Sequence, residues 1–186
     1  MHVASASLLD EVLPRFHFRS GHSTIVNAPR ETVAETVESY RSDTSPLVRL
    51  FLRLRGLRVP EGTFRSALEA TGFTVLSERP GEEILVGIVG RFWAFREQSN
   101  LITVGDVEEF VAFDLPGTAK AALTIRIESL PGGAGTRVGT ETRVQCADRA
   151  AYRRFAIYWV LIKPFSGLLR RAFLQRVKRV AEASTR

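Results

Sequence analysis

Histidine, arginine and tyrosine side chains are the groups in this sequence whose placement could support chemistry. His22 shares the period-two face of a predicted strand with Phe16, Phe18 and Val26, so its imidazole is expected to point inward. A neutral imidazole there could act as a general base or as a hydrogen-bonding group for a ligand. The alternative is a histidine in the core or at the strand end whose nitrogens bond to the backbone.

Arg91 and Trp93 raise a second question, because both faces of the strand predicted at residues 83–95 are apolar. If the face of Leu85 is inward, Arg91 lies in an apolar pocket and could bind a carboxylate or phosphate. If the face of Ile84 is inward, Arg91 lies in solvent. Periodicity leaves both alternatives open.

Aromatic side chains crowd the last predicted helix, where Phe155, Tyr158 and Trp159 follow one another closely. Aromatic residues at such spacing are typical of a core. On a helix that covers a concave sheet, core and pocket wall overlap. The hydroxyl of Tyr158 could then supply the polar contact that orients an apolar ligand.

Motifs for several classes of active site are absent from the sequence. The nucleophile elbow, the Walker phosphate loop and the dinucleotide fingerprint do not occur. His2, His17 and His22 have no cysteine or carboxylate at metal-ligand spacing, so no metal and no cofactor is expected. Cys146 is the only cysteine, which excludes an intramolecular disulfide, and it is expected to be a small buried hydrophobe.

Length and composition indicate one globular domain. The chain has 186 residues, of which 45% are hydrophobic and 25% charged. We expect a lead-in with one helical turn at residues 1–14 and a single domain at 15–186. The sequence shows neither a signal peptide nor an apolar membrane span, so a cytoplasmic location is expected.

The net charge of +6 comes mostly from arginines spread along the chain. No basic face interleaved with exposed aromatics is evident, so no nucleic-acid partner is expected. At the basic end of the last helix, Phe173 and Leu174 stand opposite arginines. This pattern fits peripheral contact with an anionic membrane, or simply a charged outer face on a docked helix.

The pattern of apolar and turn residues predicts the order of elements. A strand at 15–27 precedes a helix from Arg30, a second helix from Pro46 and a third from Thr63. Strands then follow at 73–79, 83–95, 102–113, 118–129 and 136–146. Their short connections require antiparallel hairpins, and consecutive hairpins form a meander.

The last strands alternate cleanly, which predicts one wet face and one covered face. Asp148 is a good N-cap for a covering helix that runs to about Ala183. Pro164 and Gly167 are expected to kink or break this helix. Residues 152–162 are apolar nearly all round, so we expect the sheet to enclose that half.

The segment His22-Ser23-Thr24-Ile25-Val26-Asn27-Ala28-Pro29, followed by Val33 at helix spacing, resembles the opening of the START/Bet v 1-like superfamily. That superfamily includes polyketide cyclase/dehydrase and lipid-transport proteins. The order of elements over 15–183 is similar too. Phe113-Asp114-x-Pro116-Gly117 and Tyr158-Trp159 with Ile162-Lys163-Pro164 resemble an uncharacterised bacterial branch. The resemblance implies an α+β helix-grip fold, a curved antiparallel sheet wrapped around a long C-terminal helix, with two or three short helices after the first strand.

The resemblance also implies a deep, mostly apolar cavity between the sheet and the last helix. Small inward side chains at Ala119, Ala121, Thr140 and Thr142 would leave space for it. The expected function is binding of a hydrophobic small molecule, lipid or polyketide-like. The expected ligand-binding residues are His22, Arg91, Trp93, Phe110, Thr140, Thr142, Phe155, Tyr158, Trp159 and Ile162.

Two alternatives to ligand binding stay open. One is a polyketide cyclase or aromatase-like enzyme in the same cavity, for which His22, Arg91 and Tyr158 are the only candidates. No catalytic role is assigned to any of them, because none has a visible partner. The other is an interaction protein whose cavity is filled by its own side chains.

Overall fold

A computed structural model describes residues 6–40, 72–94 and 101–185. In chain order the elements are α1 (Leu8–Val12), β1 (Phe18–Val26), α2 (Arg30–Glu38), β2 (Thr74–Arg79), β3 (Glu83–Gly90), β4 (Leu101–Ile102), α5 (Val107–Ala112), β5 (Ala119–Ser129), the 3-10 turn η2 (Pro131–Gly133), β6 (Thr136–Cys146) and α6 (Arg149–Ser184). The helices predicted from Pro46 and Thr63 lie outside the described residues.

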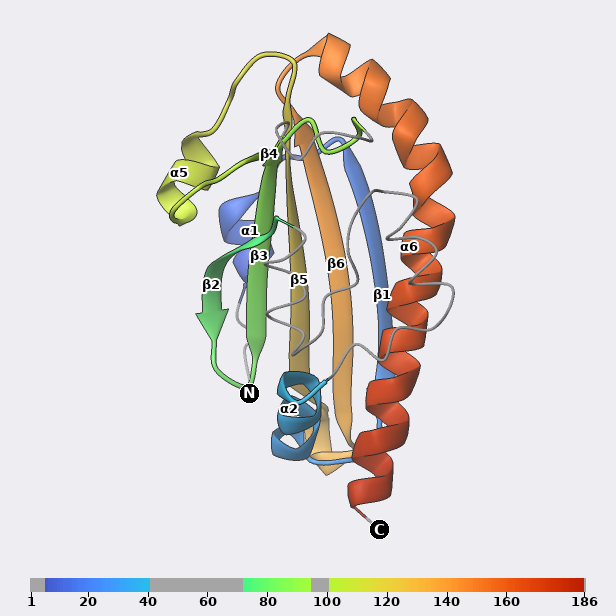
Figure 1. Ribbon diagram of the computed structural model, residues 1–186. Helices are drawn as coiled ribbons and strands as arrows, with labels where there is room; N and C mark the ends of the chain where they lie inside the picture. The colour runs from blue at the N-terminus through green and yellow to red at the C-terminus, as the bar shows by residue number, and fades with distance from the viewer. Residues whose placement is uncertain (1–5, 41–71, 95–100, 186) are drawn as a thin grey trace.

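The strands form one curved antiparallel sheet in the order β1-β6-β5-β3-β2, with β4 paired to the end of β3 (Figure 1). β2, β3, β5 and β6 follow one another antiparallel as in the predicted meander, except that β3 pairs directly with β5 without the strand predicted at 102–113 between them. The first strand returns to pair with the last one, so that Phe18 lies opposite Val144. Together with the long C-terminal helix, this sheet confirms the predicted α+β class.

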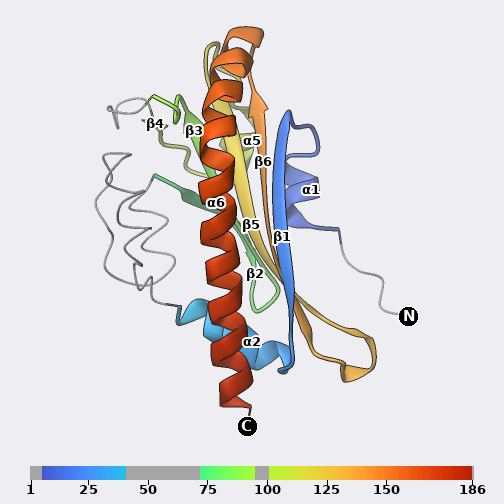
Figure 2. The same cartoon turned by 90° about the vertical axis from the view of Figure 1, so that its right-hand side faces the viewer.

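Helix α6 runs along the β1–β6 side of the sheet and contacts β1, β6 and α2 (Figures 1 and 2). Asp148 caps it as predicted, because its carboxylate accepts from the backbone N–H of Ala151 at 2.7 Å. The same carboxylate accepts from the N–H of Gly117 at 2.6 Å and so ties the loop before β5 to the start of the helix.

Two hydrophobic clusters join α6 to the concave face of the sheet. Near the start of the helix, Phe155 and Ile162 pack with Ala121 and Val144. Further along, Val177 packs with apolar residues of β1, α2 and β6. Burying a large apolar side chain such as Phe155 contributes about 1.5–3 kcal/mol, so these clusters hold the helix on the sheet.

The opposite, convex face was predicted to be wet, and this prediction is wrong over much of its area. Helices α1 and α5 cover it, and Leu9, Leu13 and Phe110 pack there against Leu85 and Ala122. Helices of five and six residues have too few turns for apolar periodicity to reveal which face they bury.

Charged side chains of the sheet form hydrogen bonds with backbone groups at the ends of these two short helices. Glu83 is buried and accepts from the N–H of Leu8 at 3.0 Å, at the start of α1. At the end of α1, Arg143 donates to the carbonyl of Leu13 at 3.2 Å. Lys120 donates to the carbonyls that end α5, including that of Val111 at 2.7 Å. A carboxylate at the start of a hairpin strand is usually solvated, and Glu83 is buried here because the N–H of Leu8 and the hydroxyl of Thr124 donate to it.

The strand predicted at 102–113 is also a correction. Only Leu101–Ile102 pairs with the sheet, and Val107–Ala112 is the helix α5. Asp106 caps that helix by accepting from the N–H of Glu109 at 2.8 Å. Glu108 and Glu109 in the first turn stabilise the helix by interacting with its dipole. Together with the N-cap, this interaction outweighs the β-like alternation of residues 102–113.

Helix α6 is continuous through Pro164 and Gly167, so the predicted break is wrong, although the helix curves along its length (Figure 1). Pro164 is exposed, and the residue whose carbonyl loses its bond, Val160, is 73% exposed. Water can therefore satisfy the freed carbonyl. No helix within the described residues is long and apolar enough to cross a membrane.

Candidate functional site

One row of side chains crosses the concave face of the sheet from β3 to β1. Ile84 lies opposite Ile125, Ile125 opposite Thr140, and Thr140 opposite His22. Side chains paired in this way lie about 5 Å apart on a common face. The row is apolar at its β3 end and polar at its β1 end.

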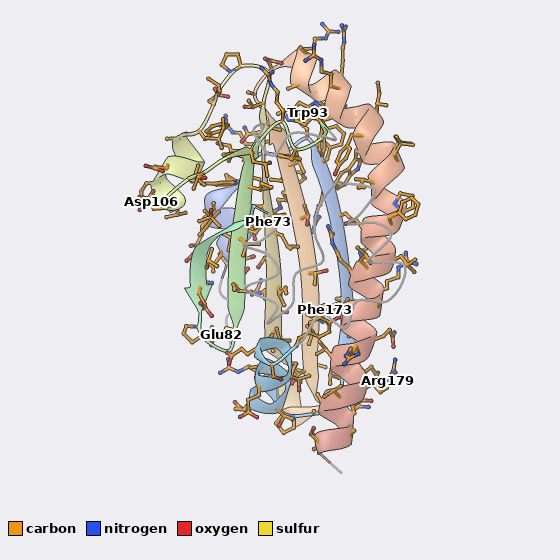
Figure 3. The ribbon with its side chains drawn as sticks, in the orientation of Figure 1. Phe73, Glu82, Trp93, Asp106, Phe173 and Arg179 are labelled. Atoms are coloured by element: carbon orange, nitrogen blue, oxygen red, sulfur yellow. The ribbon has the colours of Figure 1, made fainter. Side chains whose placement is uncertain are left out.

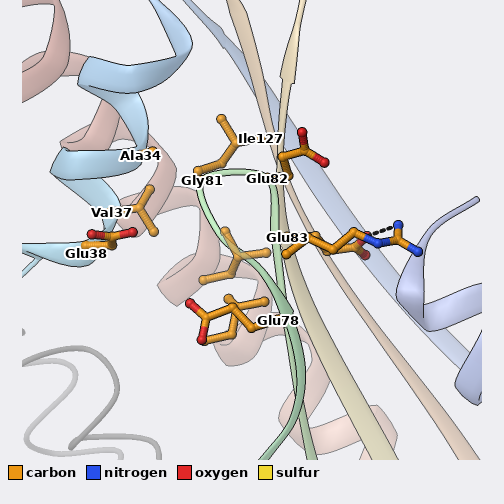
Figure 4. Close-up of a pocket in the computed structure, with 11 residues that line it drawn as sticks. Ala34, Val37, Glu38, Glu78, Gly81, Glu82, Glu83 and Ile127 are labelled. Carbon is orange, nitrogen blue, oxygen red and sulfur yellow. Dashed lines mark ion pairs between the residues drawn. The ribbon is translucent and has the colours of Figure 1, made fainter. Parts of the chain in front are cut away.

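The apolar end of the row forms part of a pocket of about 400 Å³ between α2 and the β2–β3 hairpin (Figure 4). Ile84, Ile125 and Ile127 line it from the sheet, and Ala34 and Val37 line it from α2.

Carboxylates surround this apolar floor. Glu38 and Glu78 lie beside the pocket in Figure 4, and Glu82 pairs with Arg30 at 2.7 Å. Arg79 also lines the pocket, so its rim is charged and polar, while the floor can accept a hydrocarbon group.

The polar end of the row holds two buried atoms without hydrogen-bond partners in the part of the chain that the structure describes. They are Nδ1 of His22 and Oγ1 of Thr140, and the Thr140 residue is only 4% exposed. Leaving a buried polar group unbonded costs about 1–3 kcal/mol, so native structures rarely keep two side by side. A ligand with polar atoms would satisfy both.

The side chain of His22 extends from β1 toward α6, and its ring lies against Gly167. Burial lowers the pKa of His22, and the positive charges of Arg171 and Arg170 lower it further. The imidazole is therefore neutral at neutral pH and offers one donor and one acceptor.

Arg170 reaches from α6 toward the same strands. Its guanidinium donates to the carbonyl of Ser20 at 2.9 Å, to Oγ1 of Thr142 at 2.8 Å and to Oγ of Ser166 at 3.0 Å. Burial lowers the pKa of Arg170 to about 10. All of these partners are neutral, and no carboxylate among the described residues pairs with this cation.

The arginines at the basic end of the last helix were expected opposite Phe173, on its outer face, and for Arg170 this expectation is wrong. Its spacing relative to Phe173 and Val177, three and seven residues later, is that of the buried face. That spacing is the signal that could have identified Arg170 as an inward residue.

Several predicted ligand-binding residues do come together, around the ring of Phe155. Trp93 lies 5.8 Å from it, Tyr158 5.5 Å and Trp159 5.7 Å between ring centroids. Ile162 belongs to the same cluster. Figure 3 shows Trp93 near the start of α6 and Phe173 toward its other end. The aromatic cluster thus packs near the start of α6, with Phe18 of β1 against Phe155.

Two predicted site residues lie elsewhere. Arg91 is exposed beyond the end of β3 with its guanidinium beside Gly117, because Ile84 and not Leu85 faces the concave side. Phe110 lies on the convex face, where its ring packs so closely on Gly87 that a Cβ there would come within 2.8 Å of it. Neither residue contributes to the concave row.

The three residues considered for an enzyme do not converge. His22 contacts α6 at Gly167, nine residues beyond Tyr158, which corresponds to about 13 Å along a helix. Arg91 lies beside Gly117, near the start of α6. No three His, Cys, Asp or Glu side chains within the described ranges are close enough to hold a metal ion.

A polar groove of about 720 Å³ lies on the convex face beside α1. Three of its four arginines pair with carboxylates: Arg19 with Glu141 at 2.7 Å, Arg126 with Glu128 at 2.8 Å and Arg143 with Asp10 at 2.6 Å. Because most of these charges are compensated, the groove is a weaker candidate site than the concave row.

Comparisons with known proteins do not identify the chain. No protein-family model matches it, and no curated protein is significantly similar to it. A crystal structure of a Chromobacterium violaceum protein from a structural genomics consortium is similar at 15% identity, covering 88% of this chain and 96% of that one, with a TM-score of 0.37. A TM-score this low supports no conclusion about function.

Proposed function

We propose that the concave face binds a hydrophobic small molecule that carries an anionic head group. The observation that supports this most strongly is Arg170, a largely buried cation whose partners among the described residues are all neutral. It lies beside His22 and Thr140, each of which has a buried atom without a partner in the same part of the chain. A buried charge is expected to have a counter-charge, and a ligand carboxylate or phosphate would supply it.

The arrangement also favours one orientation of the ligand. A head group at Arg170 would accept hydrogen bonds from the guanidinium and from Oγ1 of Thr140. The hydrocarbon part would follow the row through Ile125 to the pocket beneath α2. The reverse orientation would leave the anion without Arg170 and would place hydrocarbon beside the polar atoms of His22 and Thr140.

The resemblance to the START/Bet v 1-like superfamily supports the same ligand class. Its helix-grip members enclose lipids or polyketides between a sheet and a C-terminal helix, and this chain has the corresponding order of elements. We therefore propose membership of that superfamily and a fatty-acid-like or polyketide-like ligand.

Binding of a dansyl-labelled fatty acid and of its methyl ester, followed by fluorescence, tests the proposal. The acid is expected to bind at least about tenfold more tightly than the ester, since charge-assisted hydrogen bonds contribute about 1.5–3 kcal/mol. The Arg170→Met variant should lose this preference while still binding the ester. Thr140→Val should weaken binding of the acid by a smaller factor.

Arg171→Met is the matched control, because Arg171 is adjacent but exposed. Equal affinity of the wild-type protein for acid and ester would contradict the anionic head group. If neither the acid nor the ester binds to the folded protein, the ligand-binding function itself is contradicted and a filled cavity is favoured.

A further inference from the structure

The outer face of α6 carries a stripe of exposed apolar side chains. Ile157 is 70% exposed, Val160 73% and Leu161 61%, and Phe165 and Leu168 are about half exposed on the same face. Their spacing of three and four residues places them opposite the buried Phe155. Figure 2 looks onto this face of the helix. The sheet was expected to enclose this half of α6, so the exposure is a correction.

Cations flank the stripe, and α6 places no acidic side chain among them. From Arg149 to Ala181 the helix contains arginines and lysines but neither Asp nor Glu. Arg153 and Arg154 lie one turn before Ile157, and Arg171 lies about one turn after Leu168. Lys163 lies beside the stripe, and all four of these cations are exposed. Within the described residues, none of the four forms an ion pair.

This surface differs from the membrane contact expected at the basic end of the helix. There, Phe173 and Leu174 were to provide the apolar contact, but both are buried, at 8% and 3% exposure. Arg179 points away from the sheet in Figure 3. Among the described residues around it, however, no stripe of exposed apolar side chains is comparable to the one from Ile157 to Leu168. The apolar surface available for contact lies in the first half of α6.

The combination of the stripe and its cations distinguishes between partners. A second copy of the chain would cover the apolar side chains but would bring two sets of arginines together. A nucleic acid would neutralise the arginines but would leave the apolar stripe in water. An anionic bilayer takes up both, because apolar side chains enter the boundary between head groups and acyl chains while arginines and lysines remain at the phosphates.

We propose that the first half of α6 docks this protein on the surface of an anionic phospholipid membrane. Ile157, Val160, Leu161 and Leu168 insert into the interface, and Arg153, Arg154, Lys163 and Arg171 contact lipid phosphates. The stripe from Ile157 to Leu168 is about 16 Å long, so the helix lies in the plane of the interface. This inference does not depend on the proposed ligand, because Arg170 and His22 lie on the other side of the helix.

Flotation with phosphatidylcholine vesicles, with and without phosphatidylglycerol, tests the proposal. The protein is expected to bind the anionic vesicles at least tenfold more tightly than the neutral ones, and added salt should weaken binding. The double variant Val160→Glu, Leu161→Glu should lower affinity for anionic vesicles at least tenfold. Arg153→Gln, Arg154→Gln should lower it severalfold and reduce its dependence on salt.

Leu115→Glu is the control, since Leu115 is 50% exposed but lies in the loop before β5, away from the stripe. Circular dichroism establishes that each variant is folded. The proposal is overturned if the folded wild-type protein floats with neither vesicle, or if Val160→Glu, Leu161→Glu binds as the wild type does. A dimer in light scattering that the same double variant dissociates, without vesicle binding, would assign the stripe to a second copy.

Discussion

The imidazole of His22 lies against Gly167 of α6, such that a Cβ on Gly167 would stand 3.4 Å from its Nε2. The glycine lets strand and helix approach with the ring between them. The strand register places His22 on the concave face opposite Thr140, and among the described residues each has a buried atom without a partner. The packing of the long helix and the polar end of the candidate site therefore depend on the same contact.

Two substitutions at Gly167 should distinguish the effect of helix propensity on stability from the effect of the limited space beside His22. Gly167→Ala adds a Cβ at an ordinary contact distance and removes the entropic cost of a helical glycine, so unfolding should become more costly by about 0.5–1 kcal/mol. Gly167→Leu should overpack against His22 and lower the free energy of unfolding by about 1–3 kcal/mol. Urea denaturation measures both. Recovery of stability in His22→Ala, Gly167→Leu would locate the clash at the imidazole, and no recovery would argue against this contact.

Stability should decrease below neutral pH through His22. Burial and the nearby arginines lower its pKa in the folded state, so the unfolded chain takes up the proton at higher pH. The free energy of unfolding should therefore fall as the pH drops below about 6.5 and level off below the folded-state pKa. His22→Gln should remove this part of the pH dependence in urea titrations, whereas His17→Gln should retain it. An unchanged pH profile in His22→Gln would disprove the assignment.

Arg143 should be important for the attachment of α1. Its guanidinium donates to Asp10 at 2.6 Å and to the carbonyls of Leu9 and Leu13, and the residue is 7% exposed. Arg143→Met should lower the free energy of unfolding by about 2–3 kcal/mol, less than for a fully buried pair because Asp10 is half exposed. Arg19→Met, which removes an exposed partner of Glu141, should cost less than about 1 kcal/mol. Equal losses of stability in Arg143→Met and Arg19→Met would mean that the bonds from Arg143 to α1 contribute nothing.

Cys146 should be unreactive in the folded protein. Burial, with a smaller contribution from Asp148, raises the pKa of its thiol to about 12, so very little thiolate is present at pH values near 8. Ellman's reagent should react with the protein only as it unfolds, at a rate that increases with urea. Rapid reaction in native buffer would show that the strand end is open to solvent.

Much of the fold could be predicted from the sequence because its determinants are local. Strict alternation in 118–129 and 136–146 predicts paired strands, and both were found within one residue of those bounds. Asp148 marks the start of the last helix because an N-cap acts on the three residues that follow it. His22 and Thr140 were likewise placed on the concave face by period-two counting, and their strands bring them opposite each other.

Tertiary packing decided what local patterns leave open. The faces of β3 are both apolar, so only the docking of α1 and α5 on one of them made Leu85 convex and Ile84 concave. The residues around Arg170 in the sequence allow its side chain to point either outward or inward. Only the approach of α6 to the sheet gave its guanidinium hydrogen bonds to Ser20 and Thr142. The sequence by itself determined which elements form, because hydrogen bonding and capping within an element are local. Only the tertiary structure decided which faces meet, because burial depends on residues far apart in the chain.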